Sequence, residues 1–87
     1  MTTDQPASVY LENTEGSSSK FYRVRMLETG AGEFELLAQW GRIGAENPQS
    51  GTKFTGSAAA AGAEMSKLAD SKRRKGYVDA ADPGNAL

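Results

Sequence analysis

The chain has 87 residues and a formal net charge of −1 at pH 7, and it contains neither cysteine nor histidine. A chain of this length forms one small domain, and packing alone must stabilise its core because no disulfide and no thiolate or imidazole metal site can form. The same absences remove the most common nucleophile, general base and transition-metal ligands. The carboxylates form no convincing acid/base pair, so we predict a protein that is not an enzyme and binds no cofactor or metal.

The charges are distributed unevenly along the chain. Acidic residues crowd the first and last segments, whereas the middle of the chain and the end of the predicted helix are basic: Arg23, Arg25, Arg42, Lys72, Arg73, Arg74 and Lys75. A local basic surface is therefore compatible with the acidic total. No apolar run approaches the roughly 20 residues that span a bilayer, and the N-terminus has no secretory signal pattern, so we expect a cytoplasmic protein with no membrane contact.

Composition places one domain at residues 8–78, between a polar leader at 1–7 and a tail at 79–87 rich in proline, glycine and asparagine. Residues 8–13 contain enough apolar side chains for a short strand. Residues 14–19 are turn formers that connect this strand to the next one.

A β-hairpin is predicted for residues 21–27 and 33–43, joined by a glycine-rich turn. Apolar residues alternate with arginines in the first strand and with polar residues in the second. A loop centred on Gly30 sets Arg25 opposite Glu35 and apolar residues opposite one another, whereas a strict two-residue turn of Gly30 and Ala31 mixes the faces. We therefore favour the first register.

The alternation places Trp40 and Arg42 on the same side of the strand as the core residues. Either Trp40 is a core residue, or the strand bends at Gly41, where the missing side chain allows a bulge that redirects its neighbours. The sequence leaves both alternatives open.

The second half of the chain contains a short strand and a helix. Residues 52–55 form the strand around Phe54, and residues 58–75 form the helix, with Ser57 or Thr55 as its N-cap. The basic residues at its end complement the helix dipole, and Gly76 suits a left-handed C-cap.

Several of these motifs together resemble the WGR domain family. The matching residues, within about 9–77, are Lys20-Phe21-Tyr22, Trp40-Gly41-Arg42-Ile43-Gly44, Lys53-Phe54, and the helix end with Lys72, Lys75, Gly76 and Tyr77. The family occurs in poly(ADP-ribose) polymerases and in bacterial proteins that include short stand-alone members, so the resemblance implies a bacterial protein. It also implies a small antiparallel sheet with a helix packed across it.

In the polymerases the tryptophan of the motif packs against a sugar at a DNA end, and the arginine organises contacts with DNA and neighbouring domains. The resemblance transfers these roles to Trp40 and Arg42. The chain departs from the family in having no transferase domain, so polymerase activity does not transfer, and in having Met65 where an aromatic residue often fills the core face of the helix.

We therefore predict an α+β domain, with a small antiparallel sheet of about four strands and one C-terminal helix packed across it. Its predicted function is non-catalytic nucleic-acid binding, with DNA as the partner, contacted at its backbone or ends without sequence readout. The candidate binding residues are Trp40, Gly41, Arg42, Arg23, Arg25, Lys53, Lys72, Arg73 and Lys75.

Simpler interpretations compete with this site. Arg23 and Arg25 are also explained as a solvated strand face paired with Glu33 and Glu35, and the basic residues at 72–75 as helix C-terminal charges. A protein-interaction domain that docks a partner through the same surface of Trp40 and Arg42 is the alternative function. A third alternative is a scaffold that self-associates through an edge strand at residues 9–13, and the oligomeric state is left open.

Overall fold

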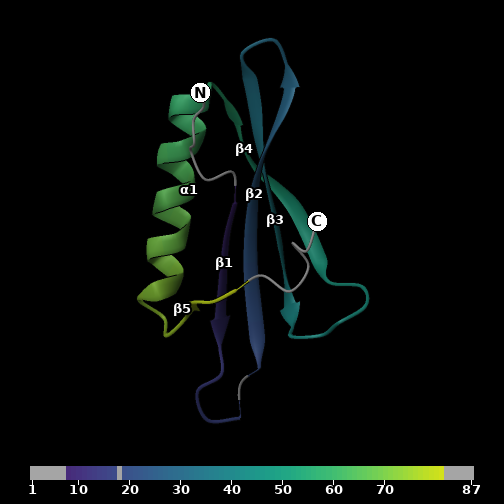
Figure 1. The fold of residues 1–87 in the computed structure, drawn as a ribbon, viewed down its shortest axis with the longest axis vertical. Coiled ribbons are helices and arrows are strands. Elements are labelled where there is room, and N and C mark those ends of the chain that lie inside the picture. The colour runs from purple at the N-terminus through teal and green to yellow at the C-terminus, as the bar shows by residue number, and fades with distance from the viewer. Residues whose placement is uncertain (1–7, 18, 82–87) are drawn as a thin grey trace.

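The computed structural model describes residues 8–17 and 19–81. The chain forms one antiparallel sheet in the order β4-β3-β2-β1-β5, with a single helix lying along one face (Figure 1). The elements are β1 (Ser8–Asn13), β2 (Lys20–Gly30), β3 (Glu33–Arg42), β4 (Gln49–Gly56), α1 (Ala58–Arg73) and β5 (Val78–Asp79). The predicted α+β class is confirmed. The predicted leader at 1–7 and most of the predicted tail lie outside the described residues.

The fifth strand is the main addition to the predicted fold. Val78–Asp79 pairs with β1, and the Ala80 amide continues this ladder by donating to the Tyr10 carbonyl over 3.2 Å. The ordered sheet therefore extends past residue 78, where the free tail was predicted to begin. β5 also covers part of the β1 edge that a self-associating scaffold was expected to use. A strand of two residues has no periodicity that sequence reading can detect.

The predicted register of the β2–β3 hairpin is wrong by two residues. Val24 lies opposite Ala38 and Arg25 opposite Leu37, so the predicted Arg25–Glu35 pair does not form. The turn is made by residues 31–32, and the ladder is irregular just before it. Because a shift of two residues preserves the alternation, each side chain still lies on the predicted face.

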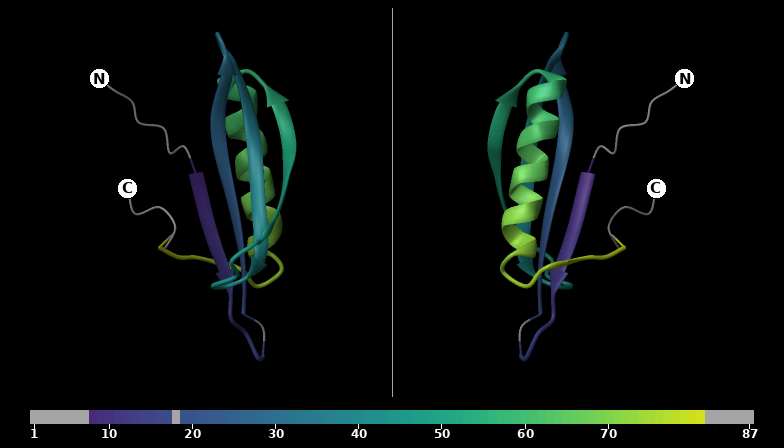
Figure 2. Two further views of the ribbon diagram at one scale, coloured as in Figure 1. Left: turned by 90° about the vertical axis from the view of Figure 1, so that its right-hand side faces the viewer. Right: turned by 90° about the vertical axis from the view of Figure 1, so that its left-hand side faces the viewer.

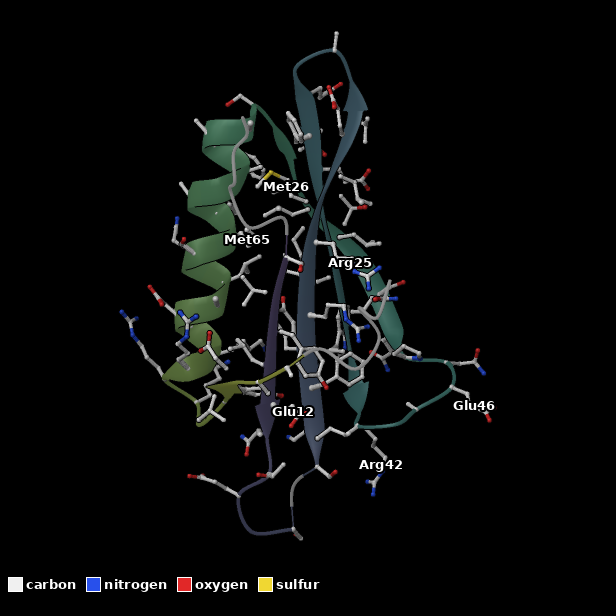
Figure 3. All side chains as sticks on the ribbon, in the orientation of Figure 1. Glu12, Arg25, Met26, Arg42, Glu46 and Met65 are labelled. Atoms are coloured by element: carbon white, nitrogen blue, oxygen red, sulfur yellow. The ribbon has the colours of Figure 1, made fainter. Side chains whose placement is uncertain are left out.

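The core lies between the sheet and the helix. Figure 2 shows α1 running along one face of the sheet, with β1 on one side of it and β4 on the other. In Figure 3, Met26 of β2 points toward the helix, whereas Arg25 lies on the other side of that strand. The buried residues of this core are Tyr22, Val24, Leu36, Ala38, Ala61 and Met65. The small alanines let the helix approach the sheet closely, and the flexible Met65 side chain fills the remaining space.

The helix begins and ends at specific signals in the sequence. The Ser57 hydroxyl caps the first turn by accepting from the Ala60 amide over 3.2 Å, as predicted. At the other end, Gly76 has a φ of 100°, and its amide donates to the Arg73 carbonyl over 3.1 Å. The Tyr77 amide donates to the Lys72 carbonyl over 3.1 Å, which completes a Schellman motif. The motif turns Tyr77 back toward the end of the helix.

Substituting alanine at two glycines tests this helix end. We expect Gly76→Ala to destabilise the domain by about 1–2 kcal/mol, because an L-residue is strained at this φ. A new Cβ would also lie 3.3 Å from the Asn13 amide nitrogen and from a Glu15 carboxylate oxygen. Gly62→Ala is the matched control: it lies inside the helix, where the new Cβ meets only the Met26 methyl group at 3.9 Å, and it should stabilise by up to about 1 kcal/mol. Urea unfolding measures both effects, and equal stability of the two variants would contradict the assigned cap.

Candidate nucleic-acid interface

Trp40 lies at the margin of the helix-covered face, opposite Tyr22 on β2 and Gln49 on β4. It is half-buried and packs against the core, with its ring centroid 6.3 Å from that of Tyr22. The indole Nε1 donates to the Gln49 side-chain oxygen over 2.8 Å. The strand therefore does not turn Trp40 out to the other face, and the indole is part of both the core margin and the surface.

Two residues of β4 shape the surface around the indole. Gly51 lies beside it, and a Cβ at that position would be in ordinary contact, 3.7 Å from the Trp40 Cη2 atom. Next along the strand, the β3–β4 ladder shifts by one residue and leaves Lys53 without a partner residue on β3. Bulges of this kind redirect side chains, and here the Lys53 ammonium lies 4.8 Å from the centroid of the Trp40 ring.

Lys72 joins this surface from the last turn of the helix. Its Nζ atom lies 4.6 Å from the centroid of the Tyr22 ring and 5.8 Å from that of Tyr77. Burial lowers the pKa of Lys72, and neighbouring positive charges lower it further. Those charges all belong to lysines: Lys75, Lys53 and Lys20. Lysines from β2, β4 and the helix end therefore lie close enough to Lys72 to repel its ammonium group.

We call this set the lysine–aromatic surface, and it consists of Lys20, Lys53, Lys72, Lys75, Tyr22, Trp40 and Tyr77. Basic side chains interleaved with aromatic rings are typical of surfaces that bind the nucleic-acid backbone.

Gly41 and Arg42 follow Trp40 at the end of β3. Gly41 has a φ of 154°, which L-residues rarely adopt, whereas a Cβ there would make only ordinary contacts, 3.7 Å from Pro48 and 3.9 Å from the Phe21 ring. Arg42 is exposed and lies opposite Lys20 in the ladder. Its side chain extends away from the sheet in Figure 3. Arg42 thus adds charge beside the lysine–aromatic surface.

Arg23 and Arg25 lie on the opposite face of the sheet. The Arg23 guanidinium carbon lies 5.3 Å from the Tyr10 ring centroid and 5.2 Å from that of Phe21, and its Nη1 donates to the Gln39 side chain over 3.0 Å. Tyr10 and Phe21 are buried and stacked on each other. Arg23 therefore packs against a second aromatic cluster, and Arg25, across from Leu37, is half-buried on the same face.

The Arg73 guanidinium donates hydrogen bonds to two carboxylates. Its Nε and Nη2 donate to the two oxygens of Asp79 over 2.7 and 2.9 Å, and its Nη1 donates to Asp70 over 2.6 Å. These hydrogen bonds raise the pKa of Arg73, and the hydrogen bond from Arg73 lowers the pKa of Asp79. Arg73 therefore ties β5 to the helix end and is not positioned with the four lysines.

The family model of the WGR domain matches residues 7–84, nearly the whole chain. The chain belongs to the WGR domain family. The match includes β5, which lies beyond the motifs that carried the resemblance. No curated protein and no solved structure matches this WGR domain.

Within residues 8–17 and 19–81, no group of three or more aspartate, glutamate, histidine or cysteine side chains is arranged to hold a metal ion. No helix in this part of the chain is long and apolar enough to cross a membrane.

The sequence analysis missed part of the lysine–aromatic surface. Lys20, Tyr22 and Tyr77 were noted as family motif residues but were not assigned to binding. The correct register would have revealed Tyr22, because it sets this ring directly opposite Trp40. Gln49 and Gly51 carried no signal, because their role depends on how β4 pairs with β3.

The ion pair of Arg73 leads to a test that separates it from the lysines. We expect Arg73→Gln to retain duplex affinity within about twofold, because the exposed pair contributes only about 0–1 kcal/mol to stability and no phosphate contact. The amide of Ala80, which donates to the Tyr10 carbonyl, should exchange faster with solvent once β5 loses this tie. Hydrogen exchange and DNA titration measure the two effects. A tenfold loss of affinity, about 1.4 kcal/mol, would contradict the prediction and show that Arg73 contributes to DNA binding.

The same pair has a pH dependence with a defined sign. Because the folded-state pKa of Asp79 lies below its unfolded value of about 3.9, its contribution is present above that pH and is lost as pH falls through the folded-state pKa. Wild type should therefore lose its protection of the Ala80 amide in acid, whereas Arg73→Gln should show no such step.

Proposed function

We propose that this domain is a non-catalytic module that binds nucleic acid, most directly DNA, through the phosphate backbone or strand ends. WGR domains are commonly nucleic-acid-binding. The observation that carries the proposal is the placement of the Lys53 and Lys72 ammonium groups over aromatic rings, with Lys20 and Lys75 close enough to act on Lys72, in a chain whose net charge is −1. The cytoplasmic and bacterial setting expected from the sequence belongs to the same proposal.

The lysines are suited to phosphate contacts. An ammonium group is a compact charge that donates to any phosphate oxygen, and each phosphate it neutralises releases condensed counterions. Burial lowers the pKa of Lys72, and repulsion from the neighbouring lysines lowers it further; a polyanion laid across the surface relieves that repulsion. The aromatic rings hold the ammonium groups of Lys53 and Lys72 in place.

Sequence readout is not part of the proposal. Base edges are read by arginine, asparagine or glutamine side chains that enter a groove. The amide oxygen of Gln49, which lies opposite Trp40 on β4, is engaged because it accepts from the indole. Contacts at this surface should therefore be the same for every DNA sequence.

The alternative of a protein-docking surface centred on Trp40 is less well supported. A tryptophan hot spot gains its energy by entering a pocket of the partner. The indole here already lies beside Gly51, next to Tyr22 and within reach of the Lys53 ammonium, so little of it is available to enter a pocket.

A titration of labelled DNA at low salt tests the proposed function. Blunt duplex, nicked duplex and single strands of equal length, each in two unrelated sequences, should all bind, with affinities that do not depend on sequence. Fluorescence anisotropy measures the binding, and circular dichroism confirms folding in the same buffer. No binding to duplex with free ends at low salt would exclude the proposal.

A further inference from the structure

The aromatic rings of the lysine–aromatic surface already have cationic partners. The Lys53 ammonium lies over Trp40, and the Lys72 ammonium lies over Tyr22 and within 5.8 Å of the Tyr77 centroid. Proteins that bind single strands through their bases need free ring faces for stacking. A ligand approaching this surface therefore meets ammonium groups before it meets ring faces.

The neighbouring Gln49 side chain is also engaged within the protein. Its amide oxygen accepts from the Trp40 indole. Among residues 8–17 and 19–81, the charged groups that shift the pKa of Lys72 are all lysines. The surface thus offers charge without shape-specific donors, since lysine lacks the planar fork with which arginine selects its partners.

From this arrangement we infer that the surface recognises a row of phosphates whatever links them, and that linear inorganic polyphosphate is a second ligand of the same lysines. Each internal phosphate of such a chain carries one negative charge, as each phosphodiester of DNA does, and it has no base or sugar that the site would need to accommodate. Release of condensed counterions favours binding of both ligands. The inference uses the site of the proposed function but does not require that DNA bind there.

Direct calorimetric titration with linear polyphosphate tests the inference, together with its competition against labelled duplex. We expect polyphosphate to bind and to displace the duplex at a phosphate concentration within about tenfold of that of unlabelled duplex. Polyglutamate at the same total charge is the control for charge alone, and it should compete at least about tenfold less well, because its lower linear charge density releases fewer counterions. Pyrophosphate is the control for chain length, and it should not displace the duplex because it cannot reach several lysines.

Variants locate the binding. Lys72→Met and Lys53→Met should each weaken polyphosphate binding by roughly tenfold. Lys67→Met is the matched control: it removes the same charge from an exposed lysine of the same helix that pairs with Glu64, and it should change affinity by less than about twofold.

The outcomes separate the inference from the proposed function. Polyphosphate binding without DNA binding supports the inference and contradicts the proposed function. DNA binding without displacement by polyphosphate overturns the inference alone. Polyphosphate affinity that neither lysine variant changes, or that polyglutamate matches, also overturns it, and binding of neither ligand overturns both.

Discussion

The double variant Lys53→Met/Lys72→Met is expected to bind duplex DNA about a hundredfold more weakly than wild type while remaining at least as stable. Each lost contact between an ammonium and a phosphate costs on the order of a factor of ten. Methionine keeps the apolar stem that packs on the aromatic rings, so the fold should lose little packing. DNA titration and urea unfolding measure the two quantities on the same preparation.

The stability half of this prediction follows from the pKa of Lys72. Its folded-state pKa lies below the value of about 10.4 in an unfolded chain, so the fold disfavours the charged form. Stability of the wild type should therefore rise as pH rises through the window between the folded-state pKa and the unfolded one. Replacing Lys72 with methionine removes the disfavoured charge at every pH, so the gain in stability should also be present at neutral pH.

A control variant and the stability measurement separate a specific loss of DNA contacts from a general loss of positive charge and from unfolding. Lys67→Met removes one positive charge from an exposed lysine of the same helix that pairs with Glu64, and its duplex affinity should match that of wild type. Unchanged affinity in the double variant would contradict the assigned surface. A loss of affinity that accompanies unfolding would show that the lysines support the fold and would leave their role in binding without support.

The second large effect concerns the core. Leu36→Ala should destabilise the domain by about 3 kcal/mol, because Leu36 is fully buried in the middle of β3 and its truncation leaves a cavity. A domain of this size has a total stability on the order of 5 kcal/mol, so most of it would be lost. The midpoint of thermal unfolding should fall by roughly 12–24 °C, at about 4–8 °C per kcal/mol.

Leu37→Ala is the matched control for this substitution. Leu37 is the next residue on the same strand, points to the opposite face and is only half-buried, so its truncation should cost less than about half as much. Equal costs at the two positions, measured by thermal unfolding, would contradict the assignment of the faces.

Local chemistry explains which parts of the fold were predictable. The alternation in β2 and β3, the Ser57 cap and the Gly76 end are short-range signals, and the structure confirms them. The register of the hairpin depends on how the turn at residues 31–32 closes, and a shift of two residues preserves every face. The periodic pattern therefore could not distinguish the predicted register from the observed one.

The candidate site was predictable only in part, because charge along the sequence does not give the face of the sheet on which a residue lies. Trp40, Lys53, Lys72 and Lys75 gather on one surface, whereas Arg23 packs against Tyr10 and Phe21 on the other face. The Lys53 bulge depends on how β4 pairs with β3, and the Arg73–Asp79 pair depends on how β5 pairs with the distant β1. Neither has a local signature, and each changes the role of a basic residue.

The salt dependence of duplex affinity tests the central claim most directly. If Lys20, Lys53, Lys72 and Lys75 each neutralise one phosphate, the logarithm of the association constant should fall with the logarithm of salt concentration with a slope of about −3.6, at about −0.9 per contact. The slope for Lys53→Met/Lys72→Met should be about −1.8. The same slope for wild type and variant, or a wild-type slope near zero, would contradict phosphate binding at the lysine–aromatic surface.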